Sequence, residues 1–234
     1  MTRFFRLSVL ALSGCLVVLA PVAADDKKDG DRGWVQLFNG KDLTGWKPWH
    51  GGKTDKTRWE VQDGLLTASG PTGHLFSERG DYDNFRYRAE VKINKGGNSG
   101  MYFRAQDTTP GFENAWPYGY EAQIAHDHDR CATGGLWDFS YFGTVRGKLP
   151  PEDLKKISVR QTDVKPDEWF TQEVIADGNH IIIRVNGKTT VDYVDRRNTY
   201  RKGHFALQHH DARTQVFFRK VEYKPLPPSK ATDK

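Results

Sequence analysis

Residues 85–93 alternate strictly between apolar and charged side chains, and this pattern constrains the fold more than any other. The apolar positions are Phe85, Tyr87, Ala89, Val91 and Ile93, and the charged positions are Arg86, Arg88, Glu90 and Lys92. Successive side chains of a β-strand point to opposite faces of the sheet. The segment is therefore predicted to be a strand with one face in a core and the other in water.

Further short strands and turns are predicted along the rest of the chain. Asp63-Gly64 and Asn186-Gly187 are strong signals for two-residue hairpin turns. Other strands are expected at residues 59–61, 65–67, 101–104, 120–124, 169–176, 180–185, 189–193, 203–210 and 216–223. Helical periodicity is nearly absent, and one short helix is expected at residues 151–157. The pattern predicts an all-β protein, a β-sandwich or jelly roll.

The N-terminus resembles a secretory signal peptide. Arg3 and Arg6 precede an apolar run that is too short for a membrane span, and small residues at 22–24 offer a cleavage site. The mature protein is expected to be secreted or periplasmic. The alternative is a lipoprotein box at residues 12–15, in which Cys15 carries a lipid anchor. The expected parts are a signal peptide at 1–24, a flexible leader at 25–32, one domain at 33–226 and a tail at 227–234.

The mature chain is only mildly basic. The full sequence has a formal net charge of +5, and removal of Arg3 and Arg6 leaves 33 basic against 30 acidic residues, a net charge of +3. No basic run stands out, so a nucleic-acid partner is not expected. Cys131 cannot form an internal disulfide and is interpreted as a bystander thiol. Nothing indicates a Ser-His-Asp elbow, a phosphate loop or a paired-cysteine zinc motif.

Two polar side chains share one face of the predicted strand at residues 120–124. The core face is formed by Tyr120, Ala122 and Ile124. Glu121 and Gln123 then point together to the other face, near the glycine-rich turn that holds Asn98 and the strand that holds Arg104. A carboxylate, an amide and a guanidinium on one face suit a polar ligand such as a sugar. Glu121 is a candidate general acid or base, and a solvent-facing strand residue is the alternative.

A second pair of polar side chains lies on one face of the strand that begins at His204. Gln208 and His210 share this face, and histidine is a common acid or base near neutral pH. Arg104 and Arg219 are candidates for binding hydroxyl groups or a developing oxyanion. The alternatives are a packed or exposed histidine and two surface arginines.

Residues 108–150 are expected to form a long irregular stretch rich in aromatic side chains. These are Trp116, Tyr118, Trp137, Phe139 and Tyr141, which suit either a binding cleft or a small loop core. The alternating histidine and aspartate residues at 126–129 offer ligands for a divalent cation, although a solvated loop explains them as well.

An ordered set of motifs resembles the 3-keto-disaccharide hydrolase domain family. The set comprises Leu-Phe-Asn-Gly-Lys-Asp-Leu-Thr-Gly-Trp at 37–46, Trp-Glu-Val at 59–61, Tyr-Asp-Asn-Phe at 82–85, Gly-Asn-Ser-Gly at 97–100, Gly-Tyr-Glu at 119–121, Thr-Gly-Gly-Leu at 133–136, Val-Asn-Gly at 185–187 and Leu-Gln at 207–208. The resemblance covers nearly the whole mature domain and implies a concanavalin A-like β-sandwich in a secreted bacterial protein. In that family a glycine often follows the histidine that is His210 here, whereas this chain has Asp211.

The resemblance implies cleavage of 3-keto-glycosides, small sugars oxidised at C3. A ketone at C3 acidifies the C2 proton, and its removal allows the leaving group at C1 to be eliminated before water adds. Glu121 and His210 are then the candidates for proton transfer. The candidates for substrate binding and oxyanion stabilisation are Arg104, Asn98, Gln123, Gln208, Trp137 and Arg219. Assistance by a divalent cation stays open.

Two other classes of function stay open. A non-catalytic carbohydrate-binding module has the same expected fold. A retaining β-glucanase needs two carboxylates at close spacing, typically as Glu-x-Asp-x-x-Glu on one strand. The residue two positions after Glu121 is Gln123, so this last pattern is missing.

Overall fold

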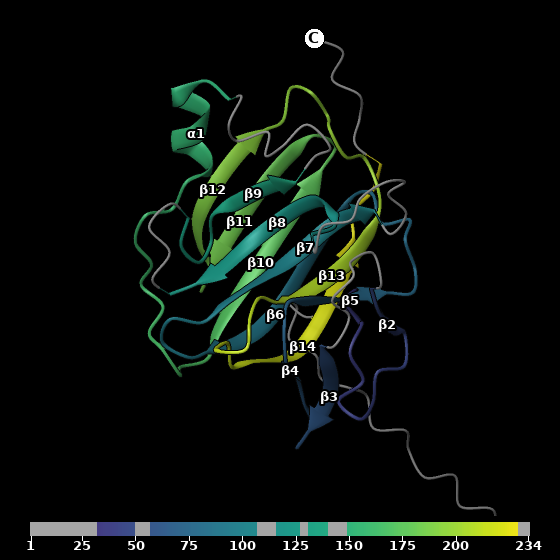
Figure 1. Cartoon of the computed structure of the whole chain (residues 1–234). Helices are drawn as coiled ribbons and strands as arrows, with labels where there is room; N and C mark the ends of the chain where they lie inside the picture. The colour runs from purple at the N-terminus through teal and green to yellow at the C-terminus, as the bar shows by residue number, and fades with distance from the viewer. Residues whose placement is uncertain (1–31, 50–56, 107–115, 127–130, 140–148, 229–234) are drawn as a thin grey trace, which may run out of the picture. The chain divides into compact units, whose positions relative to one another are not determined.

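A computed structural model of the chain describes residues 32–49, 57–106, 116–126, 131–139 and 149–228 (Figure 1). The elements in chain order are β1 (Val35–Gln36), β2 (Trp46–Pro48), β3 (Arg58–Gln62), β4 (Leu65–Ser69), β5 (Gly73–Ser77), β6 (Phe85–Ile93), β7 (Asn98–Gln106), β8 (Tyr118–Ala125), β9 (Leu136–Phe139), α1 (Pro151–Ile157), β10 (Phe170–Asp177), β11 (His180–Val185), β12 (Lys188–Val194), β13 (His204–His209) and β14 (Val216–Pro225).

The strands form two antiparallel sheets, which confirms the predicted all-β sandwich. The larger sheet has the order β12-β11-β10-β6-β14-β4-β3, with β1 paired to β14. The smaller sheet has the order β2-β5-β13-β7-β8-β9 and overlies the larger one in the view of Figure 1. Within the described residues, no helix is long and apolar enough to cross a membrane.

The core lies between the two sheets and is rich in aromatic rings. Strand β6 contributes its five apolar residues, as the alternation predicts. Tyr87 on β6 stacks on Phe205 of β13 with ring centroids 4.0 Å apart, so these two rings join the sheets. Burial of such a side chain contributes about 2–3 kcal/mol relative to an exposed one. The inner face of the smaller sheet is thus committed to the core, which leaves its outer face for a site.

The two predicted hairpin turns are present. Asp63 and Gly64 join β3 to β4 with φ angles of 50° and 77°, and Asn186 and Gly187 join β11 to β12 with φ angles of 49° and 80°. Positive φ at both turn positions matches the twist of the flanking strands and is favourable for Asn, Asp and Gly.

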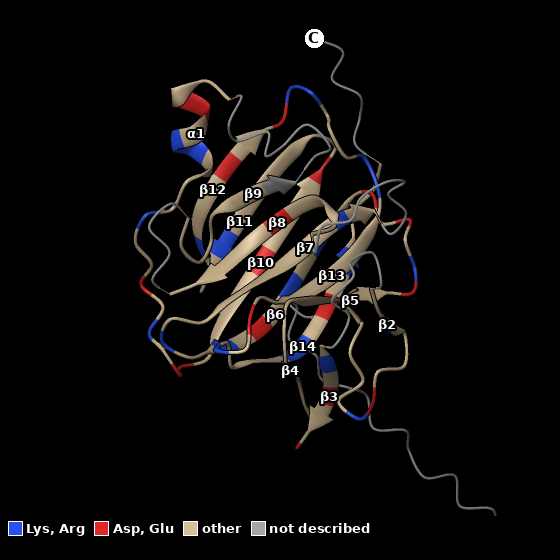
Figure 2. Ribbon diagram, viewed as in Figure 1, with Lys and Arg blue, Asp and Glu red and all other residues tan. Residues whose placement is uncertain are grey.

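The outer face of the larger sheet carries a network of ion pairs. Figure 2 shows acidic and basic residues next to one another on β6, β10 and β14. Arg86 pairs with Glu173 across β6 and β10, and Arg88 pairs with Glu222 across β6 and β14. This charged face explains why every second residue of β6 is polar.

One expectation about the chain between residues 108 and 150 is wrong. That stretch contains β8, which the pattern at residues 120–124 predicts, and also β9, a short strand that the local pattern does not indicate. Trp137 therefore lies on a strand at the edge of the smaller sheet, and Tyr118 is the first residue of β8. Tyr141 lies outside the described residues. The predicted helix at 151–157 is confirmed as α1.

Candidate functional site

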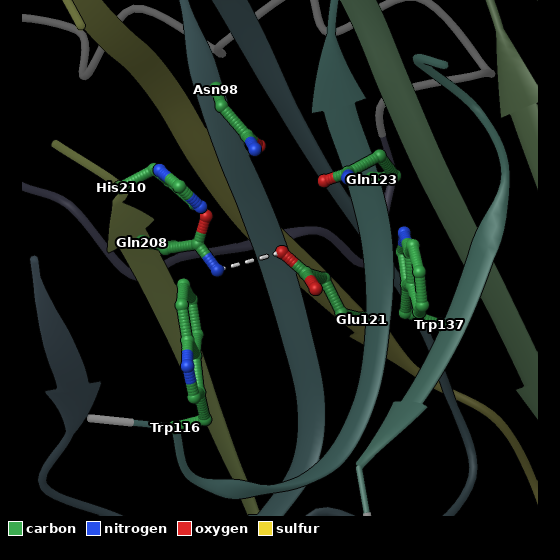
Figure 3. A pocket seen from close by; sticks show the side chains of 7 residues that line it. All are labelled: Asn98, Trp116, Glu121, Gln123, Trp137, Gln208 and His210. Carbon is green, nitrogen blue, oxygen red and sulfur yellow. Dashed lines mark hydrogen bonds between the residues drawn. The ribbon is translucent and has the colours of Figure 1, made fainter. Parts of the chain in front are cut away.

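A pocket of about 160 Å³ opens on the outer face of the smaller sheet (Figure 3). Neighbouring strands supply Asn98 from β7, Glu121 and Gln123 from β8, Trp137 from β9 and Gln208 from β13. Trp116, before β8, and His210, directly after β13, complete the lining. Two predicted pairs of polar side chains, one from each of two strands, thus meet in one place.

The strand register brings the two pairs together. Strand β7 lies between β8 and β13, and Gly100 of β7 is paired with Gln123 on one side and with Gln208 on the other. A Cβ atom at Gly100 would lie 1.9 Å from Glu121 Oε1. Glycine at this position therefore leaves the space that the Glu121 carboxyl occupies.

Glu121 is buried and held by two hydrogen-bond donors. Residue Glu121 is only 2% exposed to solvent. Its Oε1 accepts a hydrogen bond of 2.9 Å from Gln208 Nε2. The Tyr102 hydroxyl also hydrogen-bonds this carboxyl. Burial raises the pKa of Glu121 to about 8 from the ordinary 4.5, although the bonds from Tyr102 and Gln208 act in the opposite direction. The carboxyl can therefore exchange a proton near neutral pH.

Substitution of Gly100 by alanine is expected to displace the Glu121 carboxyl. The added Cβ would also lie 2.6 Å from Cδ and 2.7 Å from Cγ of Glu121, so the whole Glu121 side chain must shift. Misplacement of a reacting group by about 1 Å can cost roughly a hundredfold in rate, and we expect kcat/KM to fall by that factor. The measurement is kcat/KM of Gly100→Ala in the wild-type and Glu121→Gln backgrounds. Equal losses in both backgrounds would show that Gly100 acts independently of Glu121.

His210 is oriented by the residue that follows it. Its Nδ1 lies 3.2 Å from Asp211 Oδ2, and Asp211 also accepts hydrogen bonds from the backbone and side chain of Arg213. Partial burial acts to raise the pKa of Asp211, but the bonds from Arg213 and His210 outweigh it and lower the pKa. Asp211 is therefore an acceptor for Nδ1–H, which leaves Nε2 of His210 to exchange a proton with a ligand.

Asp211→Asn is expected to lower kcat/KM by about 10–100-fold. An asparagine lacks the negative charge that pairs with a doubly protonated His210 ring, the form in which Nδ1–H faces residue 211 and Nε2 carries the proton to be given. The measurement is the pH profile of kcat/KM for Asp211→Asn and for Asp211→Glu, which keeps the acceptor and should retain more activity. A wild-type profile in Asp211→Asn would contradict the orienting role.

The pocket is lined by aromatic rings and by amide oxygens that suit the binding of a sugar ring. Trp116 and Trp137 stand on opposite sides of the Glu121 carboxyl in Figure 3, and aromatic faces pack on the apolar faces of sugars. Asn98 Oδ1 and Gln208 Oε1 are buried acceptor atoms with no hydrogen-bond partner among the described residues. Such atoms gain a partner when a ligand hydroxyl binds.

Arg104 does not reach the pocket, which corrects the prediction that it contacts the ligand. The pairing of β7 with both neighbours shifts register around this residue, and its φ is 51°. This β-bulge breaks the alternation, and the buried guanidinium donates to the carbonyls of Asp83 and Tyr200. Arg104 ties two loops to β7 and is a structural residue.

Arg219 also lies away from the pocket. It is on β14 in the larger sheet, where Nε donates to Glu90 at 2.6 Å and the guanidinium lies 4.0 Å from the Trp169 ring centroid. It belongs to the ion-pair network of the outer face rather than to a ligand site.

Two supporting residues were not predicted from the sequence. Tyr102 lies on the pocket face two positions after Gly100, and that spacing is the signal that could have identified it. His74 on β5 is buried with its ring 5.0 Å from Tyr102 and 5.9 Å from Trp116. Burial lowers the pKa of His74 to about 3, with His210 adding to the effect, so this ring is neutral at physiological pH. The neutral His74 ring packs against Tyr102 and Trp116, two aromatic residues at the pocket.

Among the described residues, no group of three or more His, Cys, Asp or Glu side chains could hold a metal ion. Of the candidate cation ligands at 126–129, His126 is described and the other three lie outside the described residues. Cys131 is buried and is not among the residues that line the pocket.

Comparisons with known proteins agree with this fold. The chain is 32% identical over 99 residues to the 3-keto-disaccharide hydrolase of Bacteroides thetaiotaomicron, a match that covers 38% of this chain and 31% of that protein. A candidate glycosyl hydrolase from Parabacteroides distasonis has a similar structure, with a TM-score of 0.60 and 25% identity over 83% of this chain and 94% of that one. The carbohydrate-binding module CBM66 from Bacillus subtilis shares the fold at a TM-score of 0.57 and 16% identity, over 79% of this chain and 98% of that one.

A family model described as the 3-keto-alpha-glucoside-1,2-lyase-like domain matches residues 33–224. This match confirms the resemblance drawn from the ordered motifs, and it spans all the described strands up to Lys224. The chain therefore belongs to the 3-keto-alpha-glucoside-1,2-lyase-like domain family.

Proposed function

We propose that this protein cleaves the glycosidic bond of 3-keto-glycosides by removing the C2 proton. The observation that carries the proposal is Glu121, a buried carboxyl with a pKa near 8 in a pocket that also holds His210. A carboxyl of this kind is suited to proton transfer rather than to ion pairing. The family match and the hydrolase from Bacteroides thetaiotaomicron support the same class of substrate.

The reaction needs one base and one acid. The base takes the proton from C2, which is acidic because of the ketone at C3. The electron pair of the broken C2–H bond, which the C3 carbonyl stabilises as an enolate, forms the C1–C2 double bond as the C1–oxygen bond breaks. The leaving oxygen takes a proton from the acid. Water then adds, with its hydroxyl on C1 and a proton on C2, so the net reaction is hydrolysis.

Glu121 is assigned as the base. Both groups that contact its carboxyl, the Gln208 amide and the Tyr102 hydroxyl, can donate hydrogen bonds and so suit the ionised form. Its raised pKa makes the ionised form a stronger base. His210, whose Nδ1 faces Asp211, is assigned as the acid and gives the proton on Nε2 to the leaving oxygen.

Amides and aromatic rings are assigned to substrate binding. The amide groups of Asn98 and Gln123 are donors for the enolate oxygen that develops at C3. Trp116 and Trp137 pack on the two sides of the oxidised ring. The signal peptide predicted at residues 1–24 supports an activity outside the cytoplasm as part of the proposal.

The proposal is tested by incubating the purified protein with a 3-keto-disaccharide and with its unoxidised parent and following both by NMR. We expect cleavage of the keto sugar alone, because only a C3 ketone acidifies the C2 proton. Cleavage of both sugars at similar rates would contradict the proposal.

A carbohydrate-binding module is the second candidate, favoured by the likeness in fold to CBM66. It predicts that saccharides bind without turnover and that binding survives in Glu121→Gln. Saturation-transfer NMR on the same two sugars separates the candidates.

A further inference from the structure

A second cavity of about 190 Å³ adjoins the Glu121 pocket. The two cavities share Asn98 and His210 as lining residues, so they lie next to each other with these two residues between them. The second cavity is also lined by Ala125 at the end of β8 and by Asp211 and Arg213 after β13. These three residues do not line the first pocket.

The second cavity differs from the first in chemistry. No aromatic side chain other than the His210 ring is among its lining residues in the described part of the chain. Asp211 and Arg213 form an ion pair of 3.0 Å, in which the Arg213 side chain is 84% exposed and Asp211 is partly buried. A carboxylate beside a guanidinium offers an acceptor and several donors close together, which suits neighbouring hydroxyl groups of a sugar. The buried Asn98 Oδ1, at the junction, has no partner among the described residues.

The positions of Glu121 and His210 indicate which part of the substrate the second cavity would bind. Glu121, which takes the C2 proton, lines the first pocket only, whereas His210 lines both. The acid must stand at the glycosidic oxygen, between the oxidised ring and the leaving group. The oxidised ring then lies over Glu121, and the leaving group lies on the other side of His210.

We propose that the cavity at Asp211 and Arg213 binds the leaving group as a second sugar ring, and that Arg213 selects for leaving groups that carry hydroxyl groups. This inference rests on the proposed function. It predicts that a hydroxylated leaving group raises kcat/KM through contacts with Arg213.

The test compares a 3-keto-disaccharide with the methyl glycoside of the same oxidised ring. We expect Arg213→Ala to lower the ratio of the two kcat/KM values by about tenfold, the effect of one lost charge-assisted hydrogen bond. A disturbance of His210 through Asp211 would lower both values equally and leave the ratio unchanged. Ala125→Val, which narrows the second cavity without touching Asp211, should lower the ratio in the same direction.

Arg58→Ala is the matched control, because Arg58 is an exposed arginine paired with Glu60 on β3 of the other sheet. It should leave the ratio at the wild-type value. An unchanged ratio in both Arg213→Ala and Ala125→Val, with the keto-disaccharide still cleaved, would overturn the subsite and leave the proposed function intact.

Absence of turnover by the wild-type protein would instead overturn the proposed function. The subsite is then tested by calorimetric binding of the unoxidised disaccharide and methyl glycoside. Tighter binding of the disaccharide that is lost in Arg213→Ala would support the subsite. Equal affinities for the two sugars would overturn it.

Discussion

Glu121→Gln is expected to lower kcat/KM for a 3-keto-disaccharide by about a thousandfold. The glutamine keeps the size of the side chain and its contact with Gln208, but it cannot accept the C2 proton, and general base catalysis contributes roughly a hundredfold to ten-thousandfold. The measurement is initial rate by NMR. Glu90→Gln, on the outer face of the larger sheet, is the control and should retain wild-type kcat/KM. Equal rates for Glu121→Gln and the wild type would remove Glu121 from the mechanism.

The same substitution is expected to stabilise the folded protein above pH 5. Because the pKa of Glu121 is about 8 when folded and near 4.5 when unfolded, the folded chain keeps a proton that the unfolded chain releases between these values. Stability from this group therefore falls as pH rises from 4.5 to 8. At pH 7.5 we expect Glu121→Gln to raise the free energy of unfolding by roughly 2–4 kcal/mol, with little difference at pH 4. Urea denaturation at the two pH values measures this, and an equal effect at both would contradict the raised pKa.

Arg104→Leu is expected to destabilise the protein by about 3–5 kcal/mol. The Arg104 residue is 1% exposed, and its guanidinium donates to Asp83 O at 3.0 and 2.6 Å and to Tyr200 O at 2.9 Å. Leucine fills part of the space but leaves both carbonyls without these donors. Thermal denaturation measures the loss, and kcat/KM of the folded fraction should stay near that of the wild type.

A lysine at the same position provides the control for charge. Arg104→Lys keeps the positive charge but cannot reach both carbonyls with a planar fork, so its stability should lie between those of the wild type and Arg104→Leu. If Arg104→Leu kept wild-type stability and lost turnover, Arg104 would be a catalytic residue and its structural assignment would be wrong.

The strands could be predicted wherever one face is buried and the other is wet. Strand β6 has this arrangement, and so do the hairpins at Asp63-Gly64 and Asn186-Gly187. Strand β9 escaped prediction because it is only four residues long, and its pairing with β8 is a long-range contact that local sequence does not encode. The β-bulge at Arg104 likewise reverses a side chain that simple alternation places on the pocket face.

Each of the two polar pairs in the candidate site could be predicted from the sequence, but their meeting in one pocket could not. Alternation places Glu121 beside Gln123 and Gln208 beside His210, because each pair is two residues apart on one strand. The two pairs come together because β7 lies between β8 and β13, and this strand order cannot be derived from local sequence. Arg219 shows the same limit, since its residue type suits a ligand but its strand belongs to the other sheet.

The central claim is that cleavage begins with loss of the C2 proton. The most direct measurement is a single-turnover reaction of a 3-keto-disaccharide that carries deuterium at C2, compared with the protiated compound and followed by NMR. The account predicts slower cleavage of the deuterated sugar, because the C2–deuterium bond breaks before the leaving group departs. Equal rates, with the deuterium fully kept at C2 of the released 3-keto sugar, would contradict it and indicate direct attack at C1.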